Sequence, residues 1–135
     1  MLTNVFISTP AAAASLFFSA LTVKCREERV FVLPLDAAGR ALAKPILVSV
    51  GHEDGTAAID AGKIFREALK AGAEEIIVAH THPSGNLSPS KADIAATAKL
   101  REAGDLLSVP LIDHLILARD GDAAMRHLSL SERWT

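Results

Sequence analysis

The sequence contains little that could form disulfides, stack on nucleobases or bind polyanions. Cys25 is the only cysteine among 135 residues, which excludes an internal disulfide and suits a reducing compartment. The aromatic residues are five phenylalanines and one tryptophan, too few for a base-stacking platform. A net charge of -2 gives no excess of cations to pair with phosphates. We therefore expect no direct contact with nucleic acid.

Cys25 itself has no predicted role. Lys24 and Arg26 flank it and could lower the pKa of its thiol, which would make it a better nucleophile. No histidine lies nearby in the sequence to activate it, although one could approach in space. We therefore assign Cys25 no function.

Signals for membrane insertion and export are also missing. No apolar run reaches the roughly 18 residues that span a bilayer. No cation precedes Lys24, and Pro10 interrupts the apolar N-terminal stretch, which is atypical of a signal peptide. The sequence therefore predicts a cytoplasmic protein without membrane contact. Half of its residues are hydrophobic, enough to form one domain over residues 1–135.

Hydrophobic periodicity and turn residues predict alternating helices and strands. Apolar residues three or four apart indicate helices, and continuous apolar runs indicate central strands that are covered on both faces. A glycine-containing turn at 36–40 joins the first two strands in a hairpin. This order is typical of an α/β sandwich around one mixed sheet. The predicted helices are 10–20, 60–71 and 90–103, and the predicted strands are 30–35, 46–50, 76–82, 111–117 and 125–130.

One face of each helix is predicted to pack on the sheet. The alanine run of the first helix could equally pack against a second copy of the chain, so a homodimer is an open alternative. The residues predicted to be buried are Leu16, Phe17, Ala20 and Leu21 in the first helix, Ile64, Phe65, Ala68 and Leu69 in the second, and Ile94, Ala98 and Leu100 in the third.

The residues with the richest chemistry follow the third predicted strand. His80 and His82 are two residues apart, so in a strand both imidazoles face the same side. Pro83 keeps the residue before it extended, which keeps the imidazoles parallel. Asp93 follows Ser90 by three residues on the next helix, so its carboxylate can point toward the strand end. Two imidazoles and one carboxylate leave a tetrahedral zinc ion one open position, as in catalytic sites.

Each part of this pattern also has a more ordinary explanation. Two histidines often share a strand by chance, and Ser-x-x-Asp at a helix start usually only caps the helix. Ser88 and Pro89 by themselves predict an N-cap followed by the first helical residue. The metal hypothesis therefore depends on the strand, the proline turn and the capped helix together bringing three side chains to one place.

The whole string from His80 to Asp93, HxHPSGxxxPSxxD, resembles the JAMM signature of JAB/MPN-domain metalloproteins, and of their RadC-type branch in particular. Residues 28–36 are similar to the first core strand of that branch, and 113–116 to its Asp-His-x-Ile strand. Together the similarity covers about residues 10 to 133. Thr81 stands where that branch usually has asparagine, at a position that should face away from the metal. RadC-type proteins often carry an N-terminal helical region, for which we expect no room in this chain.

The resemblance implies a JAB/MPN fold, which is a cytidine-deaminase-like sandwich with a curved mixed sheet between helices. It implies one zinc ion per chain, held by His80, His82 and Asp93. The implied activity is hydrolysis of a peptide, isopeptide or other amide bond by metal-activated water. Two alternatives stay open at this point, a non-enzymatic interaction domain and a protein associated with DNA repair.

The resemblance also implies two residues that assist the reaction. Glu28 matches the glutamate that begins the first core strand and would act as the general base, with Glu27 as the alternative. On sequence alone the two glutamates look like ordinary surface charge. Ser90 would donate its hydroxyl to the oxyanion of the tetrahedral intermediate, a contribution of about 3 kcal/mol where one such donor has been removed.

The remaining histidines have no predicted ligand role. Asp113 and His114 are neighbours in a strand, so only one of them can face a given side. We expect His114 to be a buried, hydrogen-bonded histidine, and a role in orienting a metal ligand is the alternative. His52 could line a substrate entrance, but it and His127 are expected to be solvated or structural.

Overall fold

A computed structural model describes residues 5–21, 27–51, 59–120 and 124–131 of the chain. Within these ranges it contains three helices and five strands, so the predicted α/β class is confirmed. In chain order the elements are α1 (Pro10–Ser19), β1 (Arg29–Leu35), β2 (Ile46–Val50), α2 (Ala61–Lys70), β3 (Glu75–Thr81), α3 (Lys91–Leu107), β4 (Leu111–Asp120) and β5 (Ala124–Ser129).

The strands form one mixed sheet in the order β2-β1-β3-β4-β5. β1 and β2 form the predicted antiparallel hairpin, and Gly39 in the intervening turn has a φ of 85°, which favours glycine. Every other neighbouring pair is antiparallel except β3 and β4, which are parallel. Parallel strands need a crossover connection, and α3 supplies it. The carboxyl end of β3 is therefore followed directly by the segment that leads into α3.

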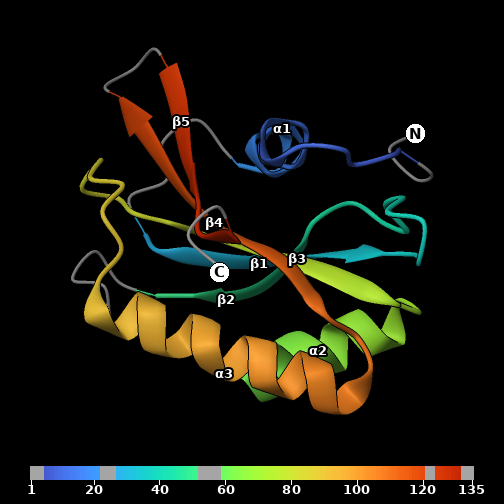
Figure 1. Cartoon of the computed structure of the whole chain (residues 1–135). Coiled ribbons are helices and arrows are strands. Elements are labelled where there is room, and N and C mark those ends of the chain that lie inside the picture. The colour runs from blue at the N-terminus through green and yellow to red at the C-terminus, as the bar shows by residue number, and fades with distance from the viewer. Residues whose placement is uncertain (1–4, 22–26, 52–58, 121–123, 132–135) are drawn as a thin grey trace.

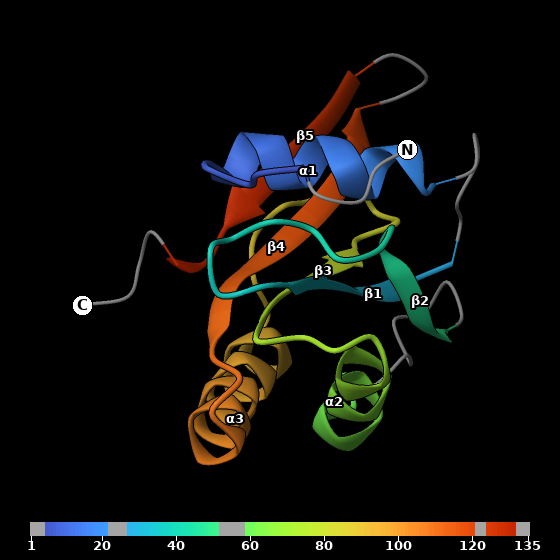
Figure 2. The ribbon, with the colours of Figure 1, turned by 90° about the vertical axis from the view of Figure 1, so that its right-hand side faces the viewer.

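Helices cover both faces of the sheet, as Figures 1 and 2 show. α1 packs on one face, where the fully buried Phe17 joins an apolar cluster from β1, β3 and β4. α2 and α3 pack on the other face, where Leu100 joins a second cluster. Along β3 the side chains alternate between the two, with Ile77 in the first cluster and Ile76 in the second. The predicted sandwich with helices on both sides is therefore present.

The alanine run of α1 packs within the chain. Ala13 and Ala14 are each only 1% exposed and belong to the cluster between α1 and the sheet. Small side chains at these positions let the helix approach the strands closely. A homodimer, if the chain forms one, cannot use these two alanines as its contact surface.

Three residues predicted to lie in the core are exposed instead. Leu69 in α2 is 48% exposed and Ile94 in α3 is 56% exposed, and Ala98 also faces solvent. The prediction chose the more apolar stripe of α3, whereas the helix turns a partly polar stripe toward the sheet. That buried stripe consists of Asp93, Thr97, Leu100 and Gly104.

α3 also continues through Leu107 and does not end near Ala103 as predicted. A Cβ atom at Gly104 would lie 2.6 Å from the carbonyl oxygen of Val109, so this glycine allows the helix to pack against the chain that follows it. Ser108, with a φ of 59°, ends the helix in the left-handed conformation that glycine usually provides. Gly104 therefore lies within α3 and allows close packing instead of ending the helix.

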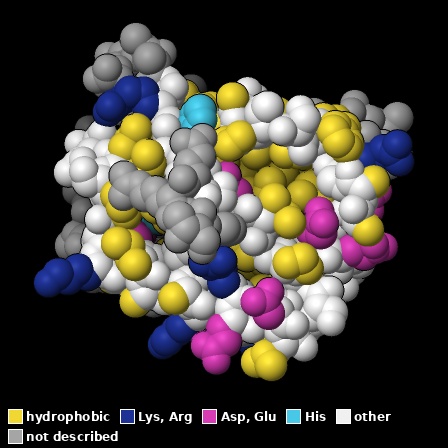
Figure 3. Space-filling view, viewed as in Figure 1, with side chains coloured by type: hydrophobic (Ala, Val, Ile, Leu, Met, Phe, Trp, Pro, Cys, Tyr) yellow, Lys and Arg dark blue, Asp and Glu magenta, His cyan; other side chains and the backbone are white. Residues whose placement is uncertain are grey.

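The molecular surface carries both signs of charge. On the face shown in Figure 3, basic and acidic side chains are interspersed with hydrophobic and uncharged groups. None of the helices in the described part of the chain combines the length and the apolar character needed to cross a bilayer.

Candidate metal centre

The end of β3 turns two imidazoles toward the layer of α2 and α3. His80 is fully buried, and the register pairs it with Val30 of β1. Thr81, the next residue, faces the opposite side, where its hydroxyl oxygen accepts a hydrogen bond from the backbone N–H of Arg29 at 2.8 Å. His82 follows the strand and returns to the side of His80. Thr81 therefore points away from the histidines, as predicted.

The first turn of α3 brings a carboxylate to the same place. Ser90 is the N-cap, and its hydroxyl oxygen accepts a hydrogen bond from the N–H of Asp93 at 3.0 Å. The Asp93 carboxylate accepts the N–H of Ser90 at 2.9 Å, which completes a capping box. The predicted cap at Ser88 is wrong by two residues, because only Ser90 has an acidic partner at the third helical position that returns the hydrogen bond.

The three side chains that the spacing predicted to converge lie together. One ligand atom from each of His80, His82 and Asp93 can be chosen so that all lie within 4.8 Å of one another. The Nε2 atoms of the two histidines are 3.0 Å apart. The Asp93 carboxylate oxygens lie 3.2 Å from Nε2 of His80 and 3.1 Å from Nε2 of His82.

The protonation of this cluster favours a bound cation. Burial raises the pKa of Asp93, but its close contacts with the imidazoles of His80 and His82 outweigh burial and hold the pKa well below its usual range. The hydrogen bond from His82 to Asp93 is the largest influence on His82 and raises its pKa. The other ring nitrogen of His82, Nδ1, is 2.7 Å from the carbonyl oxygen of Asn86, which can only accept. His82 therefore keeps its Nδ1 proton, and loss of the other proton leaves the Nε2 lone pair facing the cluster.

The side-chain atoms of His80, His82 and Asp93 that converge here are suitable ligands for a divalent cation. Two imidazole nitrogens at 3.0 Å face each other beside an ionised carboxylate, and their lone pairs repel unless a proton or a cation lies between them. Two nitrogens and one carboxylate oxygen are ligands that zinc and other divalent transition metals accept. The centre is largely buried, which strengthens the attraction between a cation and the carboxylate.

Glu28 is the carboxylate beside this cluster. It is only 8% exposed and lies two residues before Val30, so it shares the face of Val30 and His80. Burial raises its pKa, His80 opposes the rise and Asp93 adds to it, which places all three groups within electrostatic range. Glu27 has a 51% exposed side chain and lies 4.0 Å from Arg29 in an ion pair. Glu28 rather than Glu27 is therefore positioned to act on a group bound at the cluster.

Ser90 is exposed at the rim of the cluster. Its hydroxyl oxygen accepts the hydrogen bond from the N–H of Asp93, and an acceptor role leaves the hydroxyl proton free for a bound molecule. The predicted role and the capping role are therefore compatible in this residue.

Asp113 and His114 face opposite sides of β4, as predicted from alternation. Asp113 accepts hydrogen bonds from the hydroxyl of Ser129 at 2.7 Å and from the N–H of Ser131 at 3.0 Å, so it anchors the end of β5. His114 is completely buried behind His80, and burial lowers its pKa to about 3. The neutral ring contacts His80 on one side and Thr97 on the other.

Thr97 forms a hydrogen bond with His114, and the backbone of Asn86 forms one with His82. Neither contact was predicted from the sequence. Thr97 follows Asp93 by four residues on α3, so helical spacing places both on one face. Attention to that spacing could have found it. Asn86 contributes only its backbone carbonyl, which leaves no side-chain signal in the sequence. Cys25 and His52 lie outside the described residues, and His127 pairs with Leu117 between β5 and β4.

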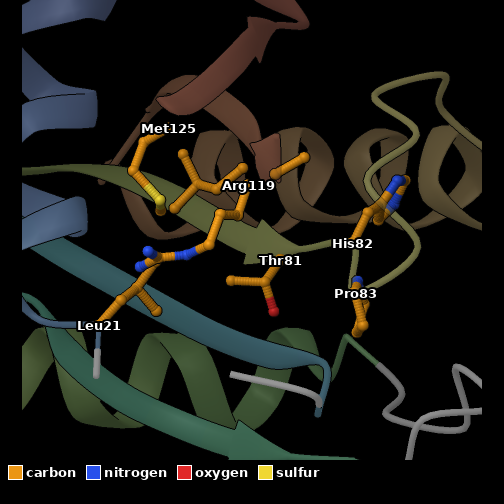
Figure 4. Close-up of a pocket in the computed structure, with 8 residues that line it drawn as sticks. Leu21, Thr81, His82, Pro83, Arg119 and Met125 are labelled. Carbon is orange, nitrogen blue, oxygen red and sulfur yellow. The ribbon is translucent and has the colours of Figure 1, made fainter. Parts of the chain in front are cut away.

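A small hollow next to His82 lies on the face of the sheet that α1 covers, to which Thr81 and Leu117 turn. Its volume is about 40 Å³, and Figure 4 shows Leu21, Arg119 and Met125 on one side of it and His82 with Pro83 on the other. Its lining is largely apolar, with one cation from Arg119. The hollow is large enough only for a small group.

An α/β sandwich that gathers two histidines and an aspartate at a strand end is a candidate metal-binding domain. The family described as RadC-like JAB domain matches residues 7–133, and the chain belongs to this family. A UPF0758 protein of Thermosynechococcus vestitus is 40% identical over 123 residues, which cover 91% of this chain and 48% of the relative. A UPF0758 protein of Clostridium perfringens is 36% identical over 132 residues, covering 98% of this chain and 55% of the relative. The chain thus spans about half the length of these relatives.

Proposed function

We propose that the chain is a zinc-dependent hydrolase of the JAMM type that cleaves a peptide, isopeptide or other amide bond. The observation that carries this proposal is the placement of a buried glutamate, Glu28, beside the convergent ligand atoms of His80, His82 and Asp93. A structural metal site needs no such base, whereas hydrolysis by water does.

His80, His82 and Asp93 would hold the zinc ion, one per chain, through Nε2, Nε2 and a carboxylate oxygen. A zinc ion with three protein ligands lowers the pKa of a bound water to about 7 and polarises a carbonyl oxygen. The ionised state of Asp93 and the imidazole lone pairs supply the charge and the geometry that the ion requires.

The reaction steps of the protein itself fall to Glu28 and Ser90. Because burial raises its pKa, the Glu28 carboxylate is a stronger base than an exposed glutamate and can take a proton from the attacking water. The same group then returns the proton to the leaving amine. The exposed hydroxyl of Ser90 would donate a hydrogen bond to the oxyanion that forms on the substrate carbonyl.

The substrate would be a peptide or another molecule with an amide bond. The mixed charge of the surface and the net charge of -2 favour a substrate other than nucleic acid. The single cysteine is consistent with the cytoplasm as the site of action.

Metal content is the first test of the proposal. Wild-type protein purified in zinc-containing buffer should retain zinc, and His80→Ala should lose it. A wild-type protein without zinc would contradict the proposal and favour the non-enzymatic interaction domain. Salt-sensitive binding of duplex DNA would instead support the DNA-repair alternative.

The second test separates the base from the ligands. Glu28→Gln should keep the zinc and reduce turnover of amide substrates by about 10²- to 10⁴-fold, the usual contribution of a general acid-base group. Glu27→Gln is the matched control, since its side chain is half exposed and pairs with Arg29, and it should keep nearly full activity. Full activity of Glu28→Gln would remove Glu28 from the mechanism.

A further inference from the structure

A continuous chain of hydrogen bonds connects two of the candidate metal ligands behind the centre. Nδ1 of His80 lies 2.8 Å from Nε2 of His114. Nδ1 of His114 lies 2.6 Å from the hydroxyl oxygen of Thr97, and this hydroxyl donates to the backbone carbonyl oxygen of Asp93 at 2.8 Å. This series of hydrogen bonds therefore runs from His80 on β3 through His114 on β4 to the backbone of Asp93 on α3.

The direction of each hydrogen bond follows from the last one. The carbonyl oxygen of Asp93 can only accept, so it takes the single hydroxyl proton of Thr97. The Thr97 oxygen must then accept from Nδ1–H of His114. A neutral imidazole that donates from Nδ1 has a lone pair on Nε2. Nε2 of His114 must therefore accept a hydrogen bond from Nδ1–H of His80.

The direction of these hydrogen bonds also determines which nitrogen of His80 carries the proton. With its proton on Nδ1, the neutral ring of His80 carries a lone pair on Nε2, the atom that faces His82 and Asp93. If the hydrogen bonds ran in the opposite direction, the proton of His80 would lie on its Nε2 atom, and this atom could not coordinate a metal ion. The burial of His80, Thr97 and His114 excludes water as a competing partner.

We propose that His114 and Thr97 are positioning residues that fix His80 in the metal-binding tautomer and hold α3 against the sheet before a metal binds. The proposal rests on the metal centre named above, but it does not depend on the reaction that the centre performs. His114 is an unusual choice for such a role, because ligating histidines most often donate to a carboxylate, a backbone carbonyl or water. Here His80 instead donates to a second histidine, His114, which in turn donates to the hydroxyl of Thr97 on α3.

The direct test observes the tautomer in the metal-free wild-type protein. Long-range ¹H–¹⁵N spectra of the imidazoles distinguish a protonated Nδ1 from a protonated Nε2. The proposal expects His80 and His114 both to be protonated on Nδ1 at neutral pH. Protonation of either ring on Nε2 alone would overturn it, and this measurement requires no variant to fold.

The second test measures zinc affinity by competition with a chromogenic chelator. Thr97→Val has nearly the same shape but lacks the hydroxyl, so its zinc Kd should rise by about 10- to 100-fold, the usual effect of losing an orienting partner. Thr97→Ser restores the hydroxyl and should return the affinity to within about threefold of wild type, well inside that range. An unchanged zinc Kd in folded Thr97→Val would overturn the proposal.

Variants at His114 test the acceptor itself. His114→Gln can place its amide oxygen near the position of Nε2 and should bind zinc more tightly than His114→Leu, which has no acceptor for the His80 proton. His127→Gln is the matched control, because it makes the same substitution on β5 outside the hydrogen-bonded chain and should leave the zinc Kd unchanged. Equal zinc affinity of the His114→Gln and His114→Leu variants would overturn the proposal. Because no readout uses turnover, failure of the proposed hydrolysis would be recognised separately.

Discussion

The two faces of the sheet are built from the same strands but differ in chemistry. The face under α1 is covered by an apolar cluster that runs along the sheet through Phe17, Ile77 and Leu117. The face under α2 and α3 is equally apolar at Val78, but changes at His80 into a network of histidines and carboxylates. One strand thus supplies stability through one face and chemistry through the last residues of the other.

This comparison suggests that the two faces can be changed separately. Mutations at sites more than about 7–10 Å apart with no shared partners usually have additive effects. The following substitutions test whether a change on one face of the sheet leaves the properties of the other face unaltered. They are ordered from the largest expected effect to the smallest.

Phe17→Ala should cause the largest loss of stability. Phe17 is completely buried between α1 and the sheet and packs against Phe31, so truncation leaves a cavity and should lower the free energy of unfolding by about 3–5 kcal/mol. Chemical denaturation of the metal-free protein measures this change. The zinc affinity of the folded fraction should stay that of wild type, and a parallel loss of affinity would show that the faces are coupled.

Asp93→Asn should act on the other face and mainly on the metal. The amide oxygen can still accept the N–H of Ser90, so the unfolding free energy should change by no more than about 2 kcal/mol, the upper range for a helix cap. Loss of the ligand charge should raise the zinc Kd by more than about 100-fold, beyond the effect of an orienting partner. Asp105→Asn, the same change near the other end of α3, should alter neither quantity. Tight zinc binding by Asp93→Asn would remove the carboxylate from the ligand set.

The pH dependence of zinc binding should come from His82. Its pKa is raised above the ordinary 6.5 in the metal-free protein, chiefly by the hydrogen bond to Asp93, and zinc must displace that proton. Affinity should therefore be constant at pH values above the raised pKa and fall about tenfold per pH unit below it. Titrations between pH 8 and 5.5 would locate the onset, which is expected above 6.5. An affinity that stays constant down to pH 5.5 would contradict a proton on His82.

Ile94→Gln should have the smallest effect. Ile94 is 56% exposed on α3, and surface substitutions away from special features usually change stability by less than about 0.5 kcal/mol. Had Ile94 been buried as its sequence pattern suggested, the loss would be several-fold larger. Denaturation of this variant therefore checks which stripe of α3 faces the sheet.

The predictable parts of the fold were those with a strong local signal. The apolar runs that became β1 and β3 are buried almost throughout. Thr9 and Asp60, polar residues at the starts of the first two predicted helices, cap α1 and α2 through their side chains. The spacing of His80, His82 and Asp93 also predicted their convergence, because a strand end and a capped helix have known side-chain directions.

The errors arose where tertiary packing overrides local preference. An apolar stripe on α3 suggested that Ile94 and Ala98 would be buried, but the stripe that includes Asp93 and Thr97 faces the sheet instead. The contact between His80 and His114 joins residues 34 positions apart on neighbouring strands, and no local pattern encodes it. The extension of α3 beyond residue 103 was not predicted, because the close contact of Gly104 with the carbonyl of Val109 is a tertiary packing contact that no local pattern encodes.

The parallel pairing of β3 and β4 has a consequence for the order of assembly. All three ligands belong to one strand-loop-helix stretch, and His82 and Asp93 are separated by 11 positions, a short loop that closes rapidly and at low entropic cost. Glu28 reaches them only when β1 docks, through contacts such as the one between Arg29 and Thr81, which are 52 positions apart. We therefore expect the three candidate ligands to come together before Glu28 joins them, so the proposed hydrolysis would depend on the completed sheet.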